Sequence, residues 1–332
     1  MAALIPQVPS TVAAAPRPPA SRTGIGHVTW RPDSGYGHLA RAGVSLWTVR
    51  AMLRRCIHRG SAVGRRAYSA VSVAERDVDI QRVGHYSSTW SNPSGAVLTS
   101  LKTDLWAAER PFVWNSIDVG GKMAVVRLPC GGLWVHSPVE LDEALRSSLD
   151  ALGPVRHIVS PNFEHVKWAA QWKEAFPEAI LWGTPGMREK FPTIPYDEEL
   201  PRDSEPPRAW GGTIRMCFAD CERTPVLGTP FFNEVIFFHS PSSTLICTDI
   251  FWNYPSDLPP GSKLWKFLMD KIYLPFYSRF MVRSRASLQA VLDCVATWEV
   301  EGLLPCHGTY IPRGGWTTFA QHLSMPSSLA KR

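Results

Sequence analysis

Three residues that can bind a metal ion each follow a short apolar stretch with the length and composition of a β-strand. They are His239 after Glu234–Phe238, Asp249 after Thr244–Thr248, and His307 after Gly302–Cys306. Because ligands in α/β folds collect beyond the carboxyl ends of strands, we expect these three side chains to meet on one rim. Imidazole and carboxylate groups are good ligands for zinc and for iron, so the sequence predicts a metal centre there.

A fourth candidate, His165, follows the apolar stretch Val155–Val159 through a short Pro-Asn loop. It stands at the start of a predicted helix, where it could equally cap the helix or bond a backbone carbonyl. The carboxylate of Asp249 directly follows an apolar strand, where it would be costly to bury without a partner. A capping contact, an ion pair or a metal could satisfy it, and we favour the metal. His239 could instead donate to its own loop or to a substrate. His136, at the end of another strand, is more typical of a packing residue.

Short apolar stretches alternate with helical patterns from Lys122 onward, which is typical of a layered α/β domain. Besides the three stretches above, the predicted strands are Lys122–Leu128, Leu133–Val139, Val155–Val159, Ala179–Trp182 and Thr213–Phe218. We expect one domain over residues 122–325. The preceding residues 69–121 would add a first strand or two, and residues 326–332 would form a tail.

Four helices are predicted between these strands. Leucines at positions 141, 145, 149 and 152 mark the apolar face of one helix, which stops at Gly153. The others are His165–Ala175, Lys263–Val282 and Arg285–Glu299. Phe191–Trp210 is rich in proline and acidic residues, so we expect a solvated loop that could form a rim over the site.

The positive charge of the chain is concentrated at its N-terminus. Residues 1–70 contain ten arginines, no lysine and one acid, Asp33, so that the overall charge of +6 leaves about −3 for residues 71–332. The Arg-rich, acid-free stretch Met52–Ser69 resembles a mitochondrial presequence with a cut between Tyr68 and Ser69. We therefore predict that residues 1–68 form a disordered region with a presequence, and that the protein enters the mitochondrial matrix. A basic tail on a protein of another organelle or of the cytoplasm is the alternative, and Met52 is a second candidate start.

The order of the candidate ligands resembles that of the metallo-β-lactamase superfamily along residues 122–312. Members carry a His-x-His-x-Asp-His loop, then a His, an Asp and a final His before glycine. When the loop is aligned on His165, the equivalent residues here are Ser160, Asn162, Glu164, His165, His239, Asp249 and His307. Three segments, Gly131–Pro138, Ser160–Asn162 and Phe238–Leu245, resemble the branch called domain of unknown function family 4336. The resemblance implies an α/β fold, the αβ/βα four-layer sandwich.

The departures from the superfamily pattern are as informative as the matches. Ser160 and Asn162 are poor zinc ligands, so the resemblance implies that one of two metal positions is empty. Glu164, His165, Asp249 and His307 keep the ligand types of the other position, which implies one zinc or iron ion. Glu164 is one methylene longer than aspartate, so its loop would have to adjust.

The chemistry that follows is hydrolysis of a small ester or thioester by a water molecule that the ion activates. Glu164 or Asp249 would orient that water, and His239 could act as proton donor or oxyanion contact. Two other functions remain open. One is a catalytically silent fold that serves as a binding or scaffold protein, with no metal, and the other is a mononuclear iron oxidoreductase.

Several classes of function are disfavoured by the sequence. The folded region has no basic excess, which argues against a nucleic-acid partner. No uncharged apolar window is long enough to span a membrane. No Gly-x-Ser-x-Gly follows a strand, and no glycine-rich nucleotide-binding motif is present. The substrate is therefore expected to be a small molecule, and the sequence does not specify the oligomeric state.

Overall fold

The computed structural model describes residues 85–114 and 116–324, which belong to one compact unit, Ser69–Arg332. The predictions made for residues 1–68, for their cleavage and for the tail 326–332 lie outside the described residues. Among the residues that the structure describes, no helix is both long and apolar enough to cross a membrane.

The first half of the domain forms a seven-stranded sheet. Its strands, in spatial order, are β1 (Thr99–Lys102), β2 (Leu105–Arg110), β5 (Gly121–Arg127), β6 (Leu133–His136), β7 (Val155–Ser160), β8 (Ile180–Gly183) and β9 (Glu198–Glu199). Pairing is antiparallel from β1 to β6 and parallel from β6 to β9. Within residues 69–121 the structure places β1 and β2 in this sheet. A small hairpin of β3 (Val113–Trp114) and β4 (Ile117–Asp118) lies between β2 and β5 in the sequence.

The helices of this half connect its parallel strands. They are α3 (Glu143–Leu152), α4 (Ala169–Ala175) and the short α5 (Met187–Lys190). The side chain of Asp142 caps α3 by accepting the Leu145 N–H at 2.8 Å, and the helix ends at Gly153 as predicted. α4 begins four residues later than expected, so His165 lies on the preceding loop. The region 191–210 was expected to be only a loop, but β9 within it pairs with β8, and a 3₁₀ turn, η1 (Arg208–Trp210), ends it.

The second half forms a four-stranded sheet in the order β10 (Ile214–Phe218), β11 (Val235–His239), β12 (Thr244–Cys247) and β13 (Gly302–Pro305). β10, β11 and β12 are antiparallel neighbours, whereas β12 and β13 are parallel. The turn between β11 and β12 is η2 (Ser240–Ser242), and Ser243 follows it with a φ of 48°. This tight turn forces β12 to run back along β11.

A long helical run precedes the last strand. It consists of α6 (Pro260–Leu268), the π-helix η3 (Met269–Tyr273), α7 (Leu274–Phe276) and the π-helix η4 (Tyr277–Met281). α8 (Arg285–Ala296) follows and is capped by Ser284, whose hydroxyl accepts the Ser287 N–H. α9 (Gly315–Ser324), which the sequence did not predict, follows β13.

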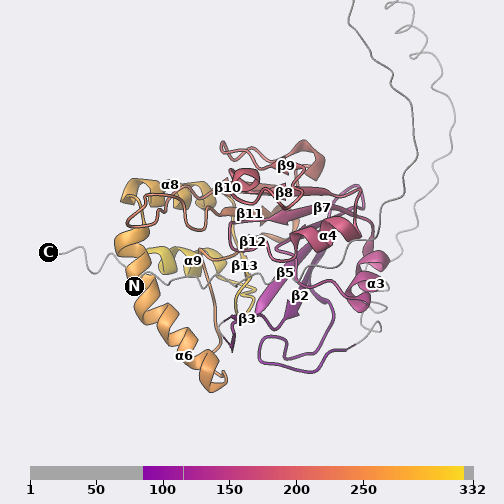
Figure 1. Cartoon of the computed structure of the whole chain (residues 1–332), viewed down its shortest axis with the longest axis horizontal. Coiled ribbons are helices and arrows are strands. Elements are labelled where there is room, and N and C mark those ends of the chain that lie inside the picture. The colour runs from indigo at the N-terminus through magenta and orange to yellow at the C-terminus, as the bar shows by residue number, and fades with distance from the viewer. Residues whose placement is uncertain (1–84, 115, 325–332) are drawn as a thin grey trace, which may run out of the picture. The chain divides into compact units, whose positions relative to one another are not determined.

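Four layers follow from the way each strand alternates its side chains. Ala107, Trp134 and Val159 of the first sheet pack against Phe237 and Ile246 of the second, which makes a core between the two sheets. The opposite face of the first sheet packs on α3 and α4, and that of the second packs on α8 and α9. The order is therefore helices, sheet, sheet, helices (Figure 1). The fold is an α/β metallo-β-lactamase-like sandwich, as predicted.

Candidate metal centre

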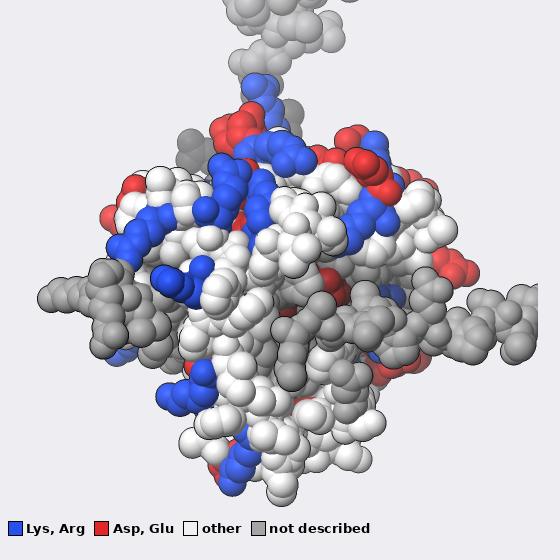
Figure 2. Space-filling view, turned by 60° about the vertical axis from the view of Figure 1, so that its left-hand side comes forward, with Lys and Arg blue, Asp and Glu red and all other residues white. Residues whose placement is uncertain are grey.

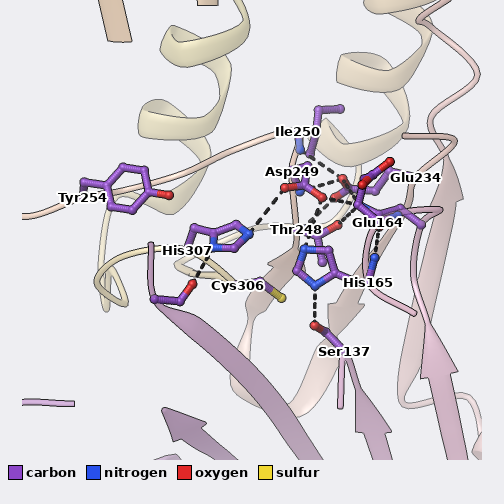
Figure 3. A network of polar contacts seen from close by, with 12 residues as sticks. Ser137, Glu164, His165, Glu234, Thr248, Asp249, Ile250, Tyr254, Cys306 and His307 are labelled. Atoms are coloured by element: carbon purple, nitrogen blue, oxygen red, sulfur yellow. Dashed lines mark hydrogen bonds and ion pairs between the residues drawn. The ribbon is translucent and has the colours of Figure 1, made fainter. Parts of the chain in front are cut away.

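The structure brings three of the predicted ligands together at one edge of the second sheet. His165, Asp249 and His307 each offer a ligand atom, and these atoms lie within 4.8 Å of one another. The Nε2 atom of His165 is 3.2 Å from Oδ2 of Asp249, and that of His307 is 3.4 Å from Oδ1 (Figure 3). Between 13% and 16% of each side chain is exposed, so the group is shielded but reachable from solvent.

Strand direction explains why two of these residues meet. β12 and β13 are parallel, and Cys247 is opposite Pro305 in their register. Asp249 and His307 each lie two residues beyond that pair, so both emerge from the same edge. His165 reaches this edge from the first sheet on the loop after β7. Neighbouring strands are about 4.8 Å apart, which is the spacing that lets ligands on adjacent strands share one ion.

Both imidazoles are held so that Nε2 faces the carboxylate. Nδ1 of His307 donates to the backbone carbonyl of Gly120 at 2.7 Å, and Nδ1 of His165 lies 2.6 Å from the Ser137 hydroxyl. A carbonyl oxygen can only accept, so in the neutral His307 the proton is on Nδ1 and the lone pair is on Nε2. Contacts of this kind, made by the ring nitrogen that does not bind the metal, orient histidine ligands in proteins.

This donor set fits a metal ion. A lone pair on His307 Nε2 that faces a carboxylate oxygen is repulsive unless a proton or a cation lies between them. Two ligands on one tetrahedral zinc, each about 2.0–2.1 Å from it, are separated by about 3.3–3.4 Å. The observed N–O separations of 3.2 and 3.4 Å match that value. His165, Asp249 and His307 are therefore the residues that would hold the ion.

The pKa values of the group reflect its burial and its charges. Burial by itself would raise the pKa of Asp249, but the imidazoles of His165 and His307 outweigh it and hold this pKa well below its usual range. Burial would lower the pKa of His307, yet the hydrogen bond and charge of Asp249, with the Gly120 carbonyl, raise it. The site is thus built to place positive charge next to Asp249.

Glu234 supports the loop that carries Asp249, a role that was not predicted from the sequence. Its buried carboxylate accepts the backbone N–H groups of Thr248, Asp249 and Ile250 at 2.7, 2.8 and 3.0 Å. Burial and the charge of Asp249 raise its pKa to about 7 against the opposing effect of these N–H groups. The sequence contains one feature that could have predicted this role, an acidic residue directly before an apolar strand. A carboxylate buried at such a place must accept hydrogen bonds from nearby donors.

Asn162 joins the two loops of the site. Its fully buried amide donates to Oδ2 of Asp249 at 2.7 Å and to the Thr248 hydroxyl at 2.9 Å. Its oxygen accepts the backbone N–H groups of Glu164 and His165 at 3.0 and 2.9 Å. The residue that the superfamily alignment put in a ligand position therefore fixes the place of two other ligands.

Glu164, the predicted fourth ligand, is not part of the three-residue group. Its side chain is exposed, and it is not among the residues whose ligand atoms all lie within 4.8 Å of one another. Its backbone N–H is bound by Asn162 beside His165. A role for Glu164 in orienting water stays a prediction.

The prediction that His239 shares the rim is wrong. β11 runs antiparallel to β12, so His239 is opposite Thr244, the first residue of β12, whereas Asp249 follows the last. The imidazole is 1% exposed, with Nδ1 2.8 Å from the Ser242 hydroxyl. Burial lowers its pKa to about 4. His239 can act neither as a ligand nor as a proton donor at the site, because the length of the strand separates them.

His136 is a packing residue, as favoured from the sequence. Its ring stacks on Trp134 with centroids 5.7 Å apart and meets the edge of Phe237. It is fully buried, and burial together with the nearby His165 lowers its pKa to about 3.

A cavity of about 840 Å³ lies beside His307. Its wall includes Gly120, Cys306 and Gly308, which bond to or flank this histidine. Lys122 is also in the wall, with only 4% of its side chain exposed, and pairs with Glu109 at 3.0 Å while donating to the Gly308 carbonyl. With Asp257 the wall carries two acids and one base, so the cavity beside the site has no excess positive charge.

Several solved structures with a similar fold are metallo-β-lactamases. DIM-1 metallo-β-lactamase, from a crystal exposed to ceftazidime, has a TM-score of 0.50 and 14% identity over 70% of this chain and 96% of that chain. FIM-1 from Pseudomonas aeruginosa in its mono-zinc form has a TM-score of 0.48 and 11% identity over 71% and 96%. The enzyme from Hirschia baltica has a TM-score of 0.47 and 10% identity over 68% and 96%. At such identities the likeness shows the fold alone.

The search of curated proteins gave no match. A family model described as "Domain of unknown function (DUF4336)" matches residues 102–268, which include β2 to α6 and two of the three ligands, His165 and Asp249. Because this match spans half of the 332 residues, the protein belongs to the DUF4336 family.

Proposed function

We propose that this protein is a metal-dependent hydrolase that holds one zinc or iron ion on His165, Asp249 and His307 and acts on a small ester or thioester. The observation that carries the proposal is the convergence of two imidazole Nε2 atoms on one carboxylate, each ring being fixed through Nδ1. Three protein ligands are typical of catalytic zinc sites, whereas structural sites use four.

When bound, the ion would polarise an ester or thioester carbonyl and lower the pKa of a water molecule. The protein's own contribution is to keep its ligands in place before substrate arrives. Asn162 holds Oδ2 of Asp249, Ser137 and Gly120 hold the imidazoles, and Glu234 holds the backbone of the Asp249 loop. Such preorganisation reduces the rearrangement needed during the reaction.

The cavity beside His307 supports a small uncharged or weakly charged substrate. Its volume of about 840 Å³ is in the range of small-molecule sites. The Lys122–Glu109 pair leaves no excess positive charge for a polyanion. The charge of about −3 over residues 71–332 agrees with this preference over nucleic acid.

A catalytically silent fold is the second candidate, and one observation favours it. The raised pKa of His307 means that a proton can also satisfy the contact with Asp249. The same three residues would then form an internal ion-pair network in a binding or scaffold protein. Metal content separates the two candidates. Because the proposed hydrolase can hold iron as well as zinc, cleavage of an ester or thioester is what separates it from the third candidate, a mononuclear iron oxidoreductase.

The decisive experiment measures metal by plasma mass spectrometry on the full chain, purified without chelator. We expect about one zinc or iron per chain in the wild type and none in Asp249→Ala. The matched control is Asp293→Ala on the exposed side of α8, which should keep the metal. A metal-free wild type would refute the proposal, and so would a metal-loaded wild type that cleaves no ester or thioester in a broad screen.

We also propose import into the mitochondrial matrix through residues 1–68, because that segment is rich in arginine and nearly free of acids. A fluorescent protein fused after residue 68 should accumulate in mitochondria, and the mature protein should begin at Ser69. A fusion that stays in the cytoplasm would refute this.

A further inference from the structure

The helical run Pro260–Met281 has an exposed apolar face that the proposed function does not use. The exposed fractions are 55% for Leu264, 54% for Phe267, 55% for Ile272, 37% for Phe276 and 58% for Phe280. Among the described residues only ten large hydrophobic side chains are exposed to this extent, and half of them lie on this one run. Apolar side chains gathered in this way mark an interaction surface.

The inner face of the same run is well packed, so the outer face is not the result of a poorly folded segment. Trp265 donates through Nε1 to the Tyr254 hydroxyl at 2.9 Å, and Trp252 donates to Asp270 at 2.9 Å. Leu274 is buried against Trp252 and Tyr254. The run is therefore held firmly on the domain with one side facing outward.

The two π-helical segments keep the apolar side chains aligned. Leu264, Leu268, Ile272, Phe276 and Phe280 recur at every fourth position. In an α-helix of 3.6 residues per turn, such a series moves steadily around the axis. A π turn, with its i to i+5 hydrogen bonds, holds more residues per turn and moves the series back. Because η3 and η4 alternate with α6 and α7, the stripe stays on one face over the whole run.

The β3–β4 hairpin extends this face. Val113 and Trp114 are 62% and 46% exposed, and the ring of Trp114 lies 5.1 Å from that of Trp265 on α6. We call the five exposed side chains of the run together with Val113 and Trp114 the apolar face. A tryptophan at the border of such a face is typical of proteins that touch a membrane interface.

Basic residues flank the apolar face. Residues 260–285 contain six of them, Lys263, Lys266, Lys271, Arg279, Arg283 and Arg285. The one acid in this stretch, Asp270, is paired with Lys266. Figure 2 shows the side of the molecule that carries α6, where white surface is interspersed with blue and little red on its left and lower parts. The local charge is thus opposite in sign to that of residues 71–332 as a whole.

We propose that the apolar face binds the surface of a membrane that contains anionic phospholipid, with the helical run lying in the plane of the interface. An apolar stripe bordered by lysine and arginine is the pattern of interfacial helices, where apolar side chains enter the acyl boundary and basic ones meet the headgroups. The proposal is independent of the metal site.

Charge also argues against two other occupants. A second copy of the chain would place one basic face against another. The chain's own residues 1–84 contain twelve arginines and four acids, so they are repelled by the same face. An anionic lipid surface complements both the apolar and the basic part.

The test is co-sedimentation of the full chain with vesicles of phosphatidylcholine containing phosphatidylserine, and with vesicles of phosphatidylcholine alone. The variant carries Leu264→Gln, Ile272→Gln and Phe280→Gln. Its matched control carries Val226→Gln and Leu227→Gln, which are 93% and 78% exposed on another loop. We expect roughly a hundredfold weaker partition for the triple variant and no change for the control, since each apolar side chain would lose about half of its burial energy.

A second variant, Lys263→Glu with Lys271→Glu and Arg279→Glu, should lose binding to the anionic vesicles at least as strongly, because each reversed charge repels the headgroups. All variants keep residues 1–84, so binding through their arginines is common to every sample. Equal binding of the wild type and both variants would overturn the proposal. So would equal binding of the wild type to both kinds of vesicle. Circular dichroism confirms that the variants are folded.

Discussion

Two histidines follow strands of the second sheet, and their surroundings are opposite. His307 follows β13 and faces Asp249, whose hydrogen bond and charge raise its pKa. His239 ends β11, is buried beside Ser242, and has its pKa lowered to about 4 by burial. One imidazole is held ready to face a cation, whereas the other is kept neutral.

Strand direction creates this difference. β13 is parallel to β12, which brings His307 to the edge where Asp249 emerges. β11 is antiparallel to β12, so His239 lies at the opposite edge of the sheet, the far edge. Glu234, just before β11, lies at the edge that carries Asp249 and His307, the metal edge. The comparison teaches that a metal-binding residue type at the end of a strand predicts a place in the site only once the direction of that strand is known.

The largest expected effect separates the two histidines directly. His307→Ala should abolish metal binding, because it removes one of three ligands, and any hydrolytic activity should fall with it. His239→Ala should keep about one metal per chain. Plasma mass spectrometry on both variants provides the measurement. Retention of metal in His307→Ala, or its loss in a folded His239→Ala, would break the comparison.

The next effect concerns the support of the metal edge. Glu234→Ala leaves three buried backbone N–H groups without an acceptor, so we expect a loss of about 3–5 kcal/mol in the free energy of unfolding. Glu234→Gln keeps one acceptor oxygen and should cost less. Urea unfolding of both variants measures this. A cost of under about 1 kcal/mol for Glu234→Ala would show that the loop does not depend on this carboxylate.

We expect the neutral His239 at the far edge to make the folded protein less stable at low pH. The pKa of His239 is about 4 in the folded chain and about 6.5 when unfolded, so below pH 6.5 the unfolded state binds the extra proton. Above that pH the residue makes no contribution, and from pH 6.5 down to 5 it costs about 2 kcal/mol of stability. His157, whose pKa burial also lowers to about 4, acts in the same direction.

His239→Gln removes that titration. The difference in unfolding free energy between pH 7 and pH 5 should therefore shrink by about 2 kcal/mol in the variant. Urea titrations at the two pH values give the difference, with His85→Gln, an exposed histidine, as control. An unchanged pH dependence would mean that His239 is protonated in the folded protein.

The smallest expected effect is at Ser242. Ser242→Ala removes the hydroxyl 2.8 Å from His239 Nδ1 and should cost about 0.5–1.5 kcal/mol without any change in metal content. Thermal unfolding and metal analysis of one preparation test both parts. A loss of metal here would contradict the separation of the two edges.

Local patterns predicted much of the fold. Leucine spacing and Gly153 located α3, and apolar stretches located the strands to within one to three residues at their ends. The layered class followed from their alternation. α9 was missed although its apolar residues have the spacing of a helix face, Trp316, Phe319, Ala320 and Leu323. The pairing of β9 was missed because it depends on tertiary contacts that periodicity does not record.

The candidate site was predicted in part. His165, Asp249 and His307 converge because parallel strands and a loop share one edge, which strand-end reasoning anticipates. His239 was misplaced because the turn Ser240–Ser242 reverses the chain, so that β11 runs antiparallel to β12. Glu234 binds backbone N–H groups of a loop that is distant in the sequence, and no sequence spacing encodes such contacts. Asn162 accepts the N–H of the nearby His165, but its contact with the Asp249 side chain is also distant in the sequence.

The π segments of the helical run also constrain how the length of this chain can change. A π turn is an α turn widened by an extra residue, so the deletion of one residue within Met269–Tyr273 would leave ordinary α-helix. The turn would absorb the loss, and the side chains after it would keep their faces. The deletion of one residue within α6 would instead rotate everything after it by about 100°. Phe276 and Phe280 would then leave the exposed stripe, and Tyr277 and Met281 would leave the interior. A codon lost in a π turn should therefore disturb the outer surface and the core much less than one lost in an α turn.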